Sequence, residues 1–128
     1  MKHFALLVVA GVVLLGSVAL AKRVAPPEVK PLVHQGVTYR AGHARDAHGN
    51  RGTVEAVDAS TGKRLWIVTV YEIPYQAGRE TDVQDVFIKS LAIDDGCLRV
   101  TDERGKSYCV ELETGTVNRL ISPRDAGV

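Results

Sequence analysis

The sequence predicts an all-β domain, an antiparallel meander of about seven strands preceded by an N-terminal hydrophobic signal helix. Three observations support this fold class. Residues 4–21 form an uncharged and largely apolar run behind Lys2. No stretch after residue 30 repeats apolar residues with the period of a helix. Instead, short segments rich in β-branched residues recur roughly every 8–12 residues, with turn residues between them.

The first segment has the three parts of a secretory signal peptide. Lys2 gives a basic start, the apolar run follows, and Ala19-Leu20-Ala21 supplies the small residues that a signal peptidase reads. We therefore expect cleavage after Ala21 and export to the periplasm or the exterior. Retention of residues 1–21 as an anchor is the alternative, because Lys22 and Arg23 follow directly and basic residues there hinder export.

The rest of the chain divides into a linker, a domain and a tail. The linker at residues 22–32 contains Pro26, Pro27 and Pro31, which exclude helix and central strand and favour an extended spacer. The β-domain is expected at residues 33–122, and a flexible tail at residues 123–128.

The charge of the chain is balanced. Its 128 residues include 16 Lys and Arg against 15 Asp and Glu, and Lys2 lies in the leader. The exported part therefore lacks the basic excess of a nucleic-acid-binding protein and the polybasic patch of a membrane-surface protein. We expect no nucleic-acid partner, and membrane contact only if the N-terminal segment is retained.

The strands of the domain are predicted by alternating or β-branched segments between turns that contain Gly, Asp or Thr. Beyond Val33, these segments are residues 54–58, 65–71, 86–93, 98–101, 108–112 and 117–121. One hairpin has a predictable register. A three-residue loop, 103–105, places Val100 opposite Tyr108 and Leu98 opposite Val110, so that apolar residues share one face.

The same register places Cys97 and Cys109 on one face of the hairpin as diagonal neighbours. Export favours a disulfide between them. Diagonal β-carbons are about 7–8 Å apart, which is long for a disulfide. The sequence therefore leaves two alternatives for Cys97 and Cys109, a disulfide and two unpaired cysteines.

A short pattern occurs twice in the domain. Residues 56–62 and 109–115 each combine the end of a strand, an acidic residue and a Thr-Gly turn. In the first copy, Asp58 is expected to accept backbone N–H groups two residues on, and Gly62 to take the positive φ of the turn. Trp66 is expected to fold back over this turn.

The residues Ala56, Asp58, Thr61, Gly62, Lys63 and Trp66 resemble the tryptophan-docking motif of quinoprotein-type (PQQ-like) β-propeller repeats. The resemblance covers residues 52–71, with a degenerate copy near 105–117 that lacks the Trp. It implies two propeller-blade-like sheets forming a small sandwich or barrel, since the chain is too short for a closed ring of about 4–8 blades. It implies a structural role for the motif residues, no catalytic residue and no cofactor.

Two loops carry candidate binding residues. The long connection before residue 86 gives a possible protein-partner surface at Tyr71, Tyr75, Asp82 and Asp85. A Gly-bounded segment holds His43, Asp46 and His48, whose side chains are of the kinds that ligate metals. Oxygen atoms of the loop at 80–85 are an alternative set for calcium, and plain polar turns are the simpler interpretation of both loops.

No nucleophile paired with a base, phosphate loop or paired Cys-x-x-Cys occurs in the sequence. The expected function is therefore that of a non-catalytic exported domain that binds an envelope or secreted protein or supports an envelope assembly. The alternative is a small ligand- or metal-binding protein that uses the 43–48 or the 80–85 loop.

Overall fold

The computed structural model describes residues 26–120, so the expected signal helix and the C-terminal tail lie outside the described residues. Within this range the chain forms eight strands and no helix that could cross a bilayer. The strands are β1 (Leu32–His34), β2 (Val37–Arg45), β3 (Gly49–Asp58), β4 (Arg64–Pro74), β5 (Ile88–Asp94), β6 (Cys97–Asp102), β7 (Ser107–Glu111) and β8 (Val117–Leu120).

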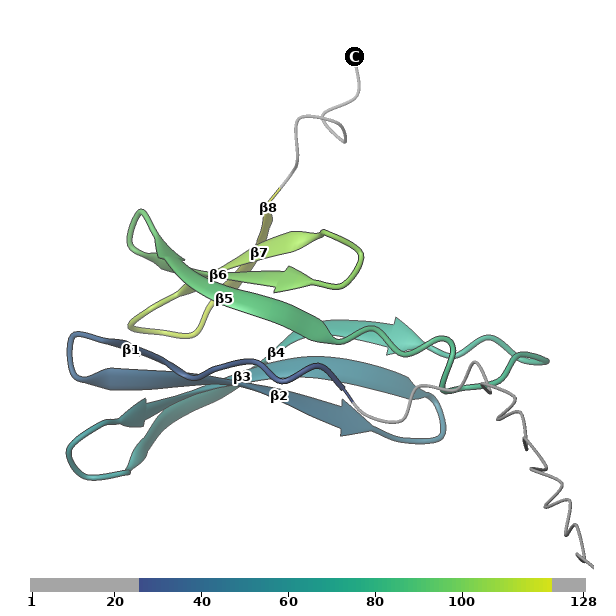
Figure 1. The fold of residues 1–128 in the computed structure, drawn as a ribbon, viewed down its shortest axis with the longest axis horizontal. Coiled ribbons are helices and arrows are strands. Elements are labelled where there is room, and N and C mark those ends of the chain that lie inside the picture. The colour runs from purple at the N-terminus through teal and green to yellow at the C-terminus, as the bar shows by residue number, and fades with distance from the viewer. Residues whose placement is uncertain (1–25, 121–128) are drawn as a thin grey trace, which may run out of the picture.

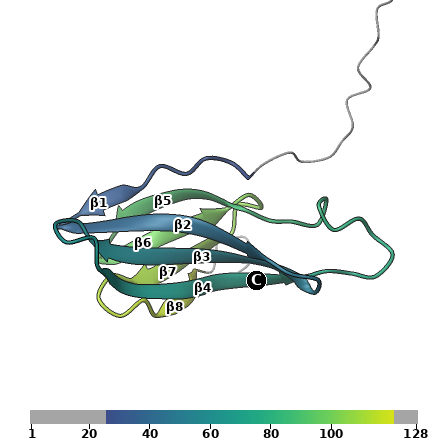
Figure 2. The ribbon, with the colours of Figure 1, turned by 90° about the horizontal axis from the view of Figure 1, so that it is seen from below.

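The strands form two antiparallel sheets in chain order, β1-β2-β3-β4 and β5-β6-β7-β8. Figure 1 shows the two sheets stacked as two layers, and Figure 2 shows β1 and β5 on one side with β4 and β8 on the other. The predicted all-β class is confirmed. Over the described residues the structure has one strand more than predicted, because the stretch that begins near Val33 forms two strands, β1 and β2. β2 extends to Arg45, into the segment that was expected to be a loop.

The core lies between the two sheets. Each strand alternates its side chains between two faces, and the apolar side chains of both sheets point inward. Along β3, for example, alternate residues from Asn50 to Ala56 are buried. Val54 packs there against the second sheet's Leu98, Val100 and Val110, all of which are fully buried.

The register of the β6–β7 hairpin is the predicted one. Val100 lies opposite Tyr108 and Leu98 opposite Val110. Gly105 closes the loop with a φ of 83°. A side chain would be strained there, which explains why the loop takes three residues with glycine last.

Cys97 and Cys109 lie on the outer face of this hairpin and are joined in a disulfide. They are diagonal neighbours, as predicted, since Cys97 pairs with Glu111 and Arg99 with Cys109. The α-carbons are 5.6 Å apart, which is within the usual range for a disulfide, so this diagonal is short enough for the bond. The twist of a β-hairpin shortens one diagonal on each face and lengthens the other, which a flat lattice does not include.

The two Thr-Gly turns have the same geometry. Asp58 Oδ1 accepts hydrogen bonds from the backbone N–H groups of Ser60 (2.9 Å) and Thr61 (3.1 Å). Gly62 N donates to Asp58 O at 2.8 Å, as Gly115 N donates to Glu111 O at 2.9 Å. Both glycines have a φ of 75°. The roles expected for Asp58 and Gly62 are therefore observed.

Trp66 does not fold over its own turn, as the sequence suggested, but crosses to the second sheet. Its Nε1 donates to the backbone oxygen of Leu112 at 3.1 Å. Its ring covers Gly115, where an added β-carbon would lie 3.0 Å from the indole. The indole is thus docked on the β7–β8 turn, and it also packs near Tyr39 of its own sheet, with ring centroids 6.0 Å apart.

Alanine substitutions at the two turn glycines should separate backbone strain from indole docking. Gly62→Ala and Gly115→Ala carry the same φ penalty, but only the second pushes a methyl group into Trp66. We expect Gly115→Ala to cost about 1 kcal/mol more than Gly62→Ala in free energy of unfolding, measured by urea denaturation.

The Trp66→Ala background provides the control, and it should itself cost about 3 kcal/mol. In that background the difference between the two glycine variants should disappear, since the clashing ring is gone. A difference that persists would contradict docking of the indole on Gly115.

Candidate partner-binding site at the crossover

A single long segment, residues 75–87, connects β4 of the first sheet with β5 of the second. We call it the crossover. It lies beyond one end of the two sheets in Figure 1. Its C-terminal part is fixed by Asn50 and Tyr71 of the first sheet. Asn50 Nδ2 and the Tyr71 hydroxyl both donate to Val86 O at 2.7 Å, and Val86 N donates back to Asn50 Oδ1 at 3.3 Å.

Asp85 holds the crossover against the end of β2. Its side chain is only 2% exposed and forms an ion pair with Arg45, with 3.4 Å between Oδ2 and Nη1. The Tyr75 hydroxyl donates a hydrogen bond to Asp85 Oδ1. Arg45 also donates to Thr81 Oγ1 at 3.2 Å, so one arginine connects the middle and the end of the crossover.

Gln84 organises the tip of the crossover from inside. Its Oε1 accepts a hydrogen bond from Gln76 N at 2.7 Å, and its Nε2 lies 3.2–3.3 Å from the backbone oxygens of Gln76, Arg79 and Glu80. These bonds tie the two arms of the crossover together. The side chain of Val83 remains 56% exposed on the resulting surface.

The crossover is also bound to the second sheet. Phe87 N donates to Glu103 Oε1 at 2.9 Å, and Glu103 N donates to Phe87 O at 3.0 Å. Glu103 belongs to the β6–β7 loop. Both sheets therefore hold this connection, and its exposed residues sit on a preorganised backbone.

The four residues predicted to contact a partner divide into two groups. Tyr71 and Asp85 are buried and support the crossover, while Tyr75 and Asp82 are partly exposed. Tyr71 stacks on Tyr108 of the second sheet, with ring centroids 5.5 Å apart. Gly52 lies opposite Tyr71, and its missing side chain makes room for that ring. Val83 and Asn50 were not predicted from the sequence, since neither belongs to a recognisable motif.

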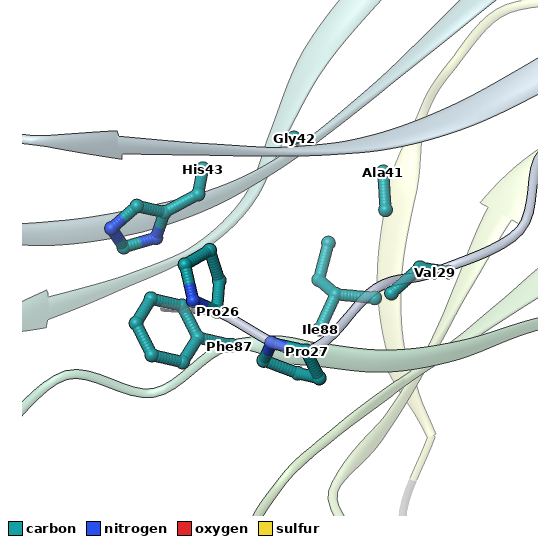
Figure 3. A pocket seen from close by; sticks show the side chains of 8 residues that line it. All are labelled: Pro26, Pro27, Val29, Ala41, Gly42, His43, Phe87 and Ile88. Carbon is teal, nitrogen blue, oxygen red and sulfur yellow. The ribbon is translucent and has the colours of Figure 1, made fainter. Parts of the chain in front are cut away.

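The part of the linker that the structure describes is not a free spacer. Residues Pro26–Val29, which we call the strap, lie against the open side between β2 and β5. Figure 3 shows Pro26 beside the rings of His43 and Phe87. Pro26, Pro27 and Val29 line a pocket of about 140 Å³ together with Ala41, Gly42, His43, Phe87 and Ile88. Val29 also packs against the core.

We call the surface that the strap covers, formed by Ala41, Gly42, His43, Phe87 and Ile88, the strap groove. Its floor is apolar and buried. Phe87 and Ile88 are 6% and 4% exposed. The imidazole of His43 meets the ring of Phe87 edge-on, with centroids 4.5 Å apart. Desolvation there lowers the pKa of His43, and the nearby Asp85 carboxylate partly opposes this shift.

The three candidate metal residues do not gather around one point, because Asp46 and His48 share the β2–β3 turn while His43 lies on β2 and packs elsewhere. His43 packs on Phe87, whereas Asp46 Oδ1 accepts the backbone N–H groups of His48 and Gly49 at 2.8 and 3.1 Å in the β2–β3 turn. Over residues 26–120, no group of three or more His, Cys, Asp or Glu side chains gathers as ligands would. In the 80–85 loop, the side-chain amide oxygen of Gln84, a candidate calcium ligand, already accepts a hydrogen bond from the backbone N–H of Gln76. Metal binding by either loop stays a prediction.

No known protein-family profile matches the chain, and no curated protein is significantly similar to it.

Asp85→Ala should loosen the crossover. The substitution removes the acceptor of Tyr75 and the ion-pair partner of Arg45, and bonds to a buried carboxylate contribute about 1–3 kcal/mol. We expect a loss of that size in urea denaturation and faster tryptic cleavage after Arg79. Asp82→Ala, in the same segment but partly exposed, should cost less than about 0.5 kcal/mol. Equal effects of the two variants would contradict the anchoring role of Asp85.

All four tyrosines of the chain should resist ionisation while the protein is folded. Burial raises the pKa of Tyr39, Tyr71 and Tyr108. Burial, and then the hydrogen bond to Asp85, raises the pKa of Tyr75 to about 12. The unfolded chain releases these protons near pH 10, so stability should fall as the pH rises above that value.

The measurement is an alkaline titration of phenolate absorbance. We expect no tyrosine of the folded protein to ionise with its ordinary pKa. All four should ionise together when the protein unfolds at higher pH. A fraction that titrates reversibly near pH 10 would show that one of these hydroxyls is open to solvent.

Proposed function

We propose that this chain is an exported, non-catalytic β-domain that binds an envelope or secreted protein through the outer surface of the crossover. The observation that carries the proposal is the polar network that fixes the crossover to both sheets while Val83 stays exposed. A loop held in one conformation loses little conformational entropy on binding. Binding residues are commonly placed on such loops above a rigid scaffold.

The disulfide supports the export part of the proposal. Disulfides persist in oxidising compartments and are rare in the cytosol of most organisms. The bond between Cys97 and Cys109 therefore fits the signal-like sequence of residues 1–21. If that segment is retained, it would anchor the domain at a membrane.

We further propose that the two sheets are two copies of one propeller-type repeat. The equivalent turns at Gly62 and Gly115 and the four-stranded meander of each sheet support this origin. The docking of Trp66 on the second turn supports it as well. A structural repeat fits a scaffold that presents a loop.

Site-specific photo-crosslinking in the native envelope tests the partner surface. A photoreactive side chain in place of Val83 should yield one discrete crosslinked species. The matched control replaces Val33, which is 65% exposed and belongs to β1. In Figure 1, β1 lies at the opposite end of the sheets from the crossover. The absence of a species at position 83, or the same species from position 33, would refute the crossover as the binding surface.

A further inference from the structure

The strap groove differs from the other surfaces of the domain because its occupant is visible. Pro26, Pro27 and Val29 lie across it and enclose the pocket, with Pro26 beside His43 and Phe87. Proline-rich segments dock in this way on aromatic-lined grooves of other proteins, because the polyproline conformation is already fixed and costs little entropy to bind.

The strap groove also contains a sheet edge and apolar side chains that would be exposed to water without the strap. β1 pairs with β2 only from Val37 to Tyr39. Beyond that point the edge of β2 faces the strap and not a strand, within the described residues. An uncovered sheet edge beside buried apolar side chains is a site for association with other chains. The strap covers Phe87 and Ile88 there.

The strap is held by packing, whereas the crossover is held by side-chain hydrogen bonds and an ion pair. Pro26 and Pro27 remain exposed on their outer sides, and Val29 is the strap residue that packs against the core. Only Lys30 and Pro31 separate the strap from β1. Residues 26–29 form no strand pairing with β2 or with β5.

We propose that the strap groove is a docking site for an extended, proline-containing segment of a partner protein, and that the chain's own strap is its displaceable occupant. This inference rests on the proposed partner-binding function and names the chemistry of the partner. The groove adjoins the crossover, because Phe87 belongs to both. A partner that contacts Val83 therefore has the groove within reach.

Displacement follows from competition. A segment tethered next to its own site has an effective concentration of the order of millimolar, so a free peptide competes poorly with it. Replacing the strap's proline rings by glycine removes their contacts and frees the segment. The fraction of open grooves then rises, and the apparent dissociation constant for a peptide falls in proportion.

The test is a titration of the full chain with a synthetic peptide of residues 26–31, Pro-Pro-Glu-Val-Lys-Pro, followed by NMR. We expect the Pro26→Gly/Pro27→Gly variant to bind the peptide at least about tenfold more tightly than the wild type. The affected resonances should be those of Gly42, His43 and Phe87. Pro31→Gly, which changes a proline outside the groove lining, should behave as the wild type.

Three results would overturn the proposal. The first is a folded double variant that shows no saturable shifts, and the second is equal affinity in all three chains. The third is a concentration-dependent wild-type dimer with intermolecular strap contacts, which would assign the groove to exchange between copies. If the double variant fails to fold, Pro26→Gly alone serves in the same titration.

The titration and the photo-crosslinking test different proposals, so a negative result in one does not refute the other. A peptide that does not bind, with a discrete crosslink still formed at position 83, refutes the groove and leaves the crossover surface standing. Peptide binding without a crosslink at position 83 refutes the crossover surface and keeps the groove.

Discussion

The structure depends on the contact between two sheets that each have only one apolar face. Period-two alternation gives β3 its buried Val54 and Ala56, and it gives β6 its buried Leu98 and Val100. Neither four-stranded meander can bury these side chains alone, so the packing of the two sheets on each other is what removes them from water. The loops, the strap and the docked indole are all arranged around that one layer of side chains.

Local features of the fold were predictable because their causes are local. A glycine at position 105 and two apolar pairs determine the β6–β7 register, and Asp58 sits where its carboxylate reaches the next backbone N–H groups. The target of Trp66 was not predictable in this way. Its hydrogen-bond acceptor, Leu112, lies in the other sheet, and only the stacking of the sheets brings it near.

The sequence indicated the position of the crossover but not the contacts that hold it. The length of the crossover and its tyrosines indicated where to look. Asn50 and Asp85, however, lie where a polar residue is expected to face solvent. Their burial depends on partners 36 positions away for Asn50 (Val86) and 40 positions away for Asp85 (Arg45). The packing of the strap has the same cause. Three prolines predict an extended chain, but they do not say what the chain lies against.

The single tryptophan of the chain lies at the seam between the sheets, bonded to one and anchored in the other. Its fluorescence emission is therefore governed by whether the two halves are joined, more than by whether either half has formed its hairpins. A state in which both meanders are intact but separated would leave the amide circular dichroism nearly native and shift the indole spectrum toward that of the free amino acid. The molecule thus contains its own optical reporter of assembly, distinct from its secondary structure.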